Sequence, residues 1–168
     1  KSKAGSKTAF FIKTRKLILI IMMEGGETMK QQKEIVEKVV NYIEDNIKRE
    51  ISVDIIAKNV GYSKFYLNRI FSERTGITIY KYLQSRRLTI AAEKLIKTNE
   101  PITEIAYEAG YDSQQAFSLA FKQLYVYPPK IYRNMEVFVP KQNRISLHGN
   151  FYYTQNIRVI SEIKEMAA

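Results

Sequence analysis

The sequence contains no cysteine, no tryptophan and a single histidine, His148, among its 168 residues. Without cysteine there can be no disulfide framework, thiol nucleophile or thiolate zinc site. One histidine cannot build a multi-histidine metal centre. Only seven glycines are present, and neither phosphate-binding pattern, G-x-x-x-x-G-K-[ST] or G-x-G-x-x-G, occurs. We therefore expect no catalytic residues, no metal site and no cofactor, in a protein that is not an enzyme.

Long apolar runs are also lacking. The run at residues 17–23 has seven residues, whereas a helix needs about 20 to span a bilayer. It belongs to residues 1–28, which we expect to be disordered or foreign to the natural protein. That expectation rests on the sequence EGGE at residues 24–27, which a ribosome-binding sequence ahead of Met29 would encode. We expect no membrane partner and a cytoplasmic location, in association with the nucleoid.

Positive charge dominates among the side chains that are present. Lysine and arginine outnumber aspartate and glutamate by 27 to 17, for a formal net charge of +10. An excess of this sign favours a polyanionic partner. Residues 29–133 hold 17 of the basic and 12 of the acidic side chains, so the charge of this block does not identify one class of polyanion.

From residue 29 the apolar residues follow helical spacing. Six of them recur at steps of one, three and four residues on one face: Ile35, Val36, Val39, Val40, Ile43 and Ile47. A second helix is expected to begin after Ser52, an N-cap residue, and to stop at Gly61. A third is expected to begin after Ser63 and to end at Gly76. Two short helices separated by a tight turn that contains glycine describe a helix-turn-helix.

The same pattern returns 49 residues later. The sequence IAKNVGY at residues 56–62 is echoed by IAYEAGY at residues 105–111. A serine follows soon after each copy, Ser63 and Ser113, and precedes a helix with phenylalanines at helical spacing. Between the two units, residues 79–98 predict a linker helix with one apolar stripe. At ~1.5 Å per residue this helix spans ~30 Å, close to the ~34 Å that separates successive major-groove faces of B-DNA.

These elements predict an all-α fold of two homeodomain-like helix-turn-helix subdomains joined by a long linker helix. The expected boundaries are a leader at 1–28, a first subdomain at 29–78, the linker helix at 79–98, a second subdomain at 99–133 and a tail at 134–168. In the tail, residues 144–153 predict a short C-terminal β-hairpin with His148 in its turn. Three roles for the tail stay open: it docks on the second subdomain, it is the stub of an effector-binding domain, or it is a disordered end.

Several motifs across about 100 residues resemble the AraC/XylS family of transcriptional activators. The first reader unit of that family resembles AKNVGYSKFYLNRIF at residues 57–71, and its linker helix resembles RRLTIAAEKL at residues 86–95. Its second unit resembles YDSQQAF at residues 111–117 and PPKIYR at residues 128–133. The serine-glutamine-glutamine sequence and the compact start at Met29 are most similar to the small stand-alone activators of multidrug-resistance and superoxide responses.

The resemblance implies three properties: a double-stranded promoter DNA partner, recruitment of RNA polymerase and binding to DNA as a monomer. It predicts a sequence-specific transcription activator that inserts two reader helices into adjacent major grooves, within a stress or antibiotic-resistance regulon. A non-specific architectural protein of the nucleoid is the main alternative. A protein that binds RNA or single strands is another.

In the first reader helix, five residues are expected to bind DNA: Ser63, Lys64, Phe65, Asn68 and Arg69. Arg69 can make a bidentate contact to guanine, and Asn68 can pair with adenine. Phe65 can touch a thymine methyl group or pack in the core, and the resemblance favours the DNA contact. Ser63 caps the helix, whose first N–H groups can also hold a phosphate. The alternative for the whole set is a solvated polar face.

In the second reader helix, the expected DNA-binding residues are Ser113, Gln114, Gln115, Ser118, Leu119 and Lys122. Ser113 caps the helix, the two glutamines and Ser118 suit bases or phosphates, and Lys122 suits a phosphate. Leu119 stands where close relatives usually have arginine. The resemblance therefore implies that this helix discriminates less strictly between bases.

Other residues have a structural interpretation. Six aromatic residues are expected in the core rather than on a platform that stacks on single-stranded bases: Phe65, Phe71, Tyr82, Phe117, Phe121 and Tyr132. Arg86 and Arg87 are consistent with DNA contact and with a tie between the subdomains. Val126 stands where the first unit has Gly76. Because a β-branched residue disfavours positive φ, we expect a different turn at Val126.

Overall fold

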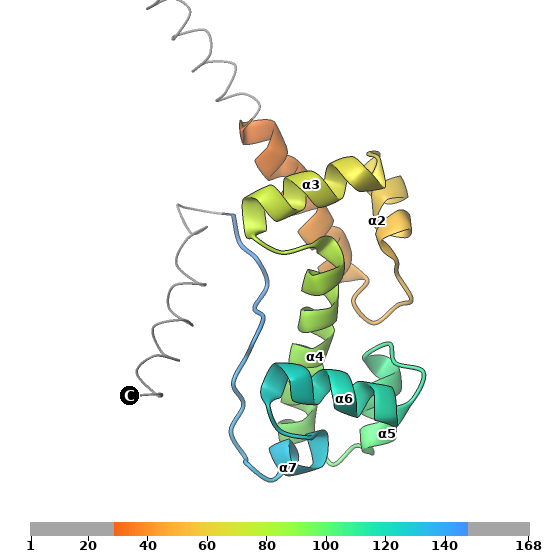
Figure 1. Cartoon of the computed structure of the whole chain (residues 1–168), viewed down its shortest axis with the longest axis vertical. Helices are drawn as coiled ribbons and strands as arrows, with labels where there is room; N and C mark the ends of the chain where they lie inside the picture. The colour runs from red at the N-terminus through yellow and green to blue at the C-terminus, as the bar shows by residue number, and fades with distance from the viewer. Residues whose placement is uncertain (1–28, 148–168) are drawn as a thin grey trace, which may run out of the picture. The chain divides into compact units, whose positions relative to one another are not determined.

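The computed structural model describes residues 29–147, and its regular elements there are all helices (Figure 1). The chain divides into two compact units, Lys1–Ile35 and Val36–Ala168. The described part of the first unit, residues 29–35, begins a helix that continues to residue 45 and is called the first helix below. The expected leader, residues 1–28, lies outside the described residues.

Further helices follow in the second unit. They are α2 (Val53–Val60), α3 (Lys64–Thr75), α4 (Ile79–Lys97), α5 (Ile102–Glu108), α6 (Gln114–Tyr125) and α7 (Pro129–Arg133). The pair α2 and α3 forms one helix-turn-helix, α5 and α6 form another, and α4 links them. The predicted all-α fold is therefore confirmed. Among residues 29–147, no helix is both long and apolar enough to cross a membrane.

Serine caps begin three of these helices. The hydroxyl oxygens of Ser52, Ser63 and Ser113 accept hydrogen bonds from the N–H groups three residues ahead, at 3.2, 3.3 and 3.2 Å. Each bond satisfies a backbone donor that has no partner within its helix. The three predicted N-caps are confirmed, so the positions at which α2, α3 and α6 begin were readable from the sequence.

The turn after α6 shares a positive φ and a capping hydrogen bond with the turn after α3, despite a different residue. Gly76 ends α3 with φ of 76° and ψ of 0°, and its N–H donates to the Ser72 carbonyl at 2.9 Å. Val126 ends α6 with φ of 71° and ψ of −36°, and its N–H donates to the Lys122 carbonyl at 2.8 Å. The turn at Val126 therefore differs from the turn at Gly76 in ψ, as expected, although its φ is positive as well. The same capping bond holds both residues in place, so Val126 is kept in a conformation that favours glycine.

Aromatic side chains fill much of both cores. In the first subdomain, the rings of Phe71 and Tyr82 lie 5.7 Å apart between centroids and are almost completely buried. In the second subdomain, the core includes Leu88, Leu95, Ile105, Phe117, Phe121, Tyr125 and Tyr132. Five of the six predicted core aromatics are therefore buried. Phe65 is the exception, because 88% of its surface is exposed.

The last described residues form no regular element. After α7, residues 136–147 run back in an extended path along α4 toward the first helix (Figure 1). Residues 144–147, the described part of the expected hairpin, are not assigned to a strand. The remainder of that hairpin, including His148, lies outside the described residues.

Candidate nucleic-acid interface

Helix α3 has a buried apolar face and an opposite, exposed face that carries the expected DNA-binding residues. Leu67, Ile70 and Phe71 are buried in the first subdomain. Lys64, Phe65 and Arg69 are exposed on the other side, and Asn68 is half-buried. Ser63 caps the helix and is exposed at its start. An apolar ring as exposed as that of Phe65 gains nothing from core packing, so its position is consistent with a contact outside the molecule.

Two neighbours on α3 hold the guanidinium of Arg69. Its Nη1 donates to Glu73 Oε1 at 3.1 Å, one helical turn away. The same guanidinium lies over the ring of Tyr66, 5.4 Å from the centroid, and Tyr66 stacks on Tyr62 at 5.5 Å. This arrangement is not among the sequence-based expectations, although the four-residue spacing of Arg69 and Glu73 is a usable signal.

Lys64, at the first position of α3, also has a partner. Its Nζ lies 2.8 Å from Asp54 Oδ2, in the first turn of α2. Both side chains are largely exposed, at 48% and 68%. Exposed pairs of this kind contribute little to stability, so Lys64 can exchange Asp54 for a phosphate at small cost.

Helix α6 presents a second exposed face. Gln114, Gln115 and Lys122 are exposed, and Ser118 is half-buried. Gln114 Oε1 accepts a hydrogen bond from the Thr103 hydroxyl of α5 at 2.8 Å. Leu119 is 64% exposed, so its side chain is not part of the core. No acidic residue occurs in α6, whereas α3 contains Glu73.

The two reader helices pack against different parts of the linker helix. Figure 1 shows α3 at the upper end of α4 and α6 in front of its lower part, and each packs against it. The 19 residues of α4 correspond to ~28 Å at ~1.5 Å per residue. The length of α4 is therefore on the scale of one turn of B-DNA.

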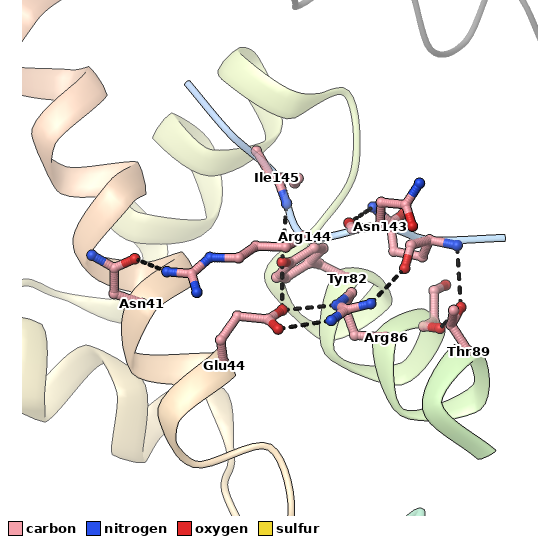
Figure 2. Close-up of polar contacts among 10 residues, drawn as sticks. Asn41, Glu44, Tyr82, Arg86, Thr89, Asn143, Arg144 and Ile145 are labelled. Carbon is pink, nitrogen blue, oxygen red and sulfur yellow. Dashed lines mark hydrogen bonds and ion pairs between the residues drawn. The ribbon is translucent and has the colours of Figure 1, made fainter. Parts of the chain in front are cut away.

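Arg86 belongs to a polar cluster rather than to the reader surface. Its Nε and Nη2 each donate to a carboxylate oxygen of Glu44 at 2.8 Å (Figure 2). The Tyr82 hydroxyl donates to Glu44 Oε1 at 2.7 Å. Only 14% of the Arg86 side chain and 11% of the Glu44 side chain are exposed. Of the two interpretations of Arg86, the structure therefore supports a structural tie.

The cluster shifts the pKa values of its members. Burial alone would raise the pKa of Glu44, but the hydrogen bonds from Arg86 and Tyr82 and the charge of Arg86 outweigh burial, so this pKa is lowered. Burial, followed by the hydrogen bond to the Glu44 carboxylate, raises the pKa of Tyr82. Both shifts favour the ionised carboxylate and the neutral phenol that the hydrogen bonds require.

Arg87 likewise connects the two subdomains. Its Nε donates to the Ile47 carbonyl at 3.0 Å, and its Nη2 donates to the Arg49 carbonyl. On the other side it reaches the turn between α5 and α6, where a Cβ added to Gly110 would lie 2.5 Å from its Nη1. The Arg87 guanidinium therefore occupies the space that a side chain at Gly110 would fill.

Comparisons with known proteins identify this arrangement. The family model described as "Helix-turn-helix domain" matches residues 56–135. The multiple antibiotic resistance protein MarA of Salmonella typhimurium is 34% identical over 117 residues, which are 69% of this chain and 92% of MarA. The regulatory protein SoxS of Escherichia coli K12 is 40% identical over 106 residues, 63% of this chain and 98% of SoxS.

The chain belongs to the AraC family of transcription regulators. A solved structure of an AraC-type regulator from Chromobacterium violaceum superposes with a TM-score of 0.59 at 29% identity, over 66% of this chain and 96% of that one. The architecture of two helix-turn-helix units on one linker helix is thus that of the AraC family. Membership makes the chain a DNA-binding transcription regulator. Within residues 29–147, no group of three or more metal-ligating side chains occurs.

Proposed function

We propose that this AraC-family protein is a sequence-specific transcription activator that reads two adjacent major grooves of promoter DNA with α3 and α6. One observation carries the proposal: α3 and α6 both expose polar faces, and both helices pack against the linker helix α4 (Figure 1). A duplex that meets both faces would be read in two grooves. The alternative is an aromatic platform that stacks on single-stranded bases. It has less support, because most of the aromatic rings that it would need are buried.

Each reader helix has a distinct part in this proposal. On α3, Arg69 reads guanine, Asn68 reads adenine and Phe65 contacts a thymine methyl group. Ser63 and Lys64 contact phosphates at the start of the helix. The stacked Tyr66 and the carboxylate of Glu73 hold the Arg69 guanidinium before DNA arrives, so less conformational entropy is lost on binding.

Helix α6 supplies a less selective reader. Gln114, Gln115 and Ser118 contact bases or phosphates, Lys122 contacts a phosphate, and Ser113 caps the helix at the phosphate backbone. Leu119 can contact only apolar groups in the groove, of which the thymine methyl group is the main one. An arginine at this position would add ~1–3 kcal/mol of base discrimination that leucine cannot supply.

Selection of bound duplexes from a random library tests sequence-specific binding. We expect a two-part site whose α3 half is the better defined. Arg69→Ala should lower the preference for the selected over a random duplex by ~1–3 kcal/mol and leave the salt dependence of binding nearly unchanged. Lys97→Ala, which removes one exposed charge from α4, is the matched control and should keep the preference.

Two other results would argue against the proposal. Equal affinity for selected and random duplexes at the same salt concentration would favour a non-specific architectural protein. If Arg69→Ala weakens binding to all sequences alike and lowers the salt slope by about 1, Arg69 is a phosphate contact.

The activator role needs a separate test, because DNA binding alone does not recruit RNA polymerase. The name of MarA, a multiple antibiotic resistance protein, supports the antibiotic-resistance regulon of this proposal, which also includes a stress response and a cytoplasmic location. We expect the purified chain to increase transcription by purified bacterial RNA polymerase from a promoter that carries the selected site. Binding to the site without an increase in transcript would contradict activation.

A further inference from the structure

The residues after α7 join the second subdomain to the first by a route separate from α4. We call residues 134–147 the return segment. It leaves α7, runs beside α4 and ends next to the first helix (Figure 1). The first subdomain is thus connected to the second twice, once through α4 and once through the return segment.

At its start, the return segment is fixed to the second subdomain. The N–H of Val139 donates to the Tyr132 hydroxyl at 3.1 Å. Phe138 packs against the core cluster that contains Tyr132. Arg133 donates to the carbonyls of Leu95 and Glu100, at 3.3 and 2.6 Å, and so fixes α7 to the end of α4.

In its middle, the segment binds the linker helix through its backbone. The Gln142 N–H donates to the Thr89 hydroxyl at 3.1 Å, and the Gln142 carbonyl accepts from Arg86 Nη1 at 2.8 Å. Thr89 is buried. Both backbone polar groups of Gln142 are therefore paired with side chains of α4.

At its end, the segment reaches the first subdomain. The Ile145 N–H donates to the Tyr82 hydroxyl at 3.3 Å, and Arg144 Nη2 donates to the Asn41 side chain of the first helix at 2.7 Å (Figure 2). Leu147 is only 2% exposed. The apolar end of the segment is therefore buried, which holds it more firmly than exposed hydrogen bonds alone would.

Glu44 joins these contacts to the first helix. Its carboxylate binds Arg86 and Tyr82, both on α4, and these same two side chains bind the return segment at Gln142 and Ile145. The first helix, α4 and the return segment therefore meet in one hydrogen-bonded cluster. Such a shared cluster restricts rotation of the first subdomain about the end of α4.

We propose that the return segment, through Tyr82, Arg86 and Arg144, positions α3 relative to α6 and so sets the spacing at which the two readers bind DNA. This inference rests on the two-groove function proposed above. After one reader binds, the second binds within the same molecule, and its effective concentration depends on how closely the connection matches the span between the sites. Two connections restrict that span more than one.

A spacing change of one base pair provides the measurement. It moves one half-site by ~3.4 Å and rotates it by ~34° relative to the other. For the wild-type chain, we expect about tenfold weaker binding when one base pair is inserted between the halves of the selected site, because the second reader no longer meets its groove in register.

The test variant is Tyr82→Phe combined with Arg144→Ala in the full chain. It removes the hydroxyl that binds Glu44 and Ile145, and the guanidinium that binds Asn41. The matched control is Tyr107→Phe with Arg49→Ala, which changes the same residue types at exposed positions outside the cluster. Hydrogen exchange at Gln142 and Ile145 reports whether the return segment has detached.

We expect the one-base-pair insertion to weaken binding by the test variant only about twofold or less. The affinity of this variant for a duplex with only the α3 half-site should stay within about twofold of wild type. The control variant should keep the preference of the wild type. A test variant with unchanged spacing preference overturns the inference, whether or not exchange at Gln142 and Ile145 has increased. A wild-type chain without preference for the selected sequence refutes the proposed function, and the inference falls with it.

Discussion

Val126 is strained by its place at the end of α6. A β-branched residue at φ of 71° is held in a region that costs on the order of 1–3 kcal/mol. We expect Val126→Gly to raise the free energy of unfolding by about 1 kcal/mol, because relief of strain exceeds the entropy that glycine loses on folding. Chemical denaturation at equilibrium measures this difference.

A second valine provides the control for Val126. Val137 is also exposed, at 62%, and it is not among the described residues with positive φ. Val137→Gly adds the same entropy cost without relief of strain, so it should lower the free energy of unfolding. If both substitutions destabilise the protein alike, Val126 carries no strain.

Glu44 makes stability depend on pH. Its pKa is lowered from the ordinary value of 4.5, so its contribution is present above that value and is lost as the pH falls through the lowered pKa. At pH 7 we expect Glu44→Gln to lower the free energy of unfolding by about 3 kcal/mol, because Arg86 keeps its charge with little solvent and no counter-charge.

Acid titration of stability tests the sign of this effect. As the pH falls through the lowered pKa, the wild-type carboxyl becomes neutral as well, so the difference between wild type and Glu44→Gln should shrink toward zero. Urea denaturation of both proteins between about pH 3 and pH 7 measures it. A difference that grows on acidification would contradict the lowered pKa.

At the scale of elements, the two glycine turns form a matched pair. Gly61 and Gly110 have φ of 82° and 81°, so alanine meets the same backbone penalty at either position. A Cβ at Gly61 has no atom within 4 Å, whereas one at Gly110 would lie 2.5 Å from Arg87 Nη1. Alanine at Gly110 must therefore displace the guanidinium that binds the Ile47 and Arg49 carbonyls.

We expect Gly61→Ala to cost about 1 kcal/mol of stability and Gly110→Ala about 1–2 kcal/mol more. Thermal denaturation of the two variants gives the difference. Equal losses would mean that Arg87 moves aside without cost and does not hold the turn between α5 and α6.

The beginnings and ends of the helices could be predicted because their signals are local. An N-cap serine directly precedes each of three helices: Ser52, Ser63 and Ser113. A glycine in the left-handed region ends two of these helices, at Gly61 and Gly76. Burial of the aromatics also followed from helical spacing. Phe65 did not follow that rule, because it lies on the face of α3 opposite Leu67, Ile70 and Phe71, which are buried in the first subdomain.

Contacts between distant residues could not be predicted from local patterns. Arg86 carries the same sequence signal whether it binds DNA or Glu44, 42 residues earlier. The return segment has neither helical nor alternating periodicity, so local patterns do not predict its path along α4. The expected hairpin overlaps this segment only at residues 144–147. Its position depends on Thr89, Tyr82 and Asn41, which are separated in the sequence from the segment that they bind.

At the scale of the whole molecule, one chain carries both proposed readers, so the proposed function requires no second copy to reach two grooves. We expect one protein per duplex that contains the selected two-part site, because a dimer would leave two of its four readers without DNA. Sedimentation of the complex at increasing protein concentration measures this ratio. A limiting ratio of two proteins per site would contradict binding as a monomer.

The return segment also has a consequence for the order of folding. Helix-turn-helix contacts join residues close in sequence and can form as each subdomain is synthesised, whereas long-range contacts form slowly. The bond between Asn41 and Arg144 joins residues 103 positions apart. The first subdomain is therefore among the earliest parts of the described chain to leave the ribosome. It is also among the last to be complete, because its contacts with Arg144 and Ile145 form only after the return segment has been synthesised.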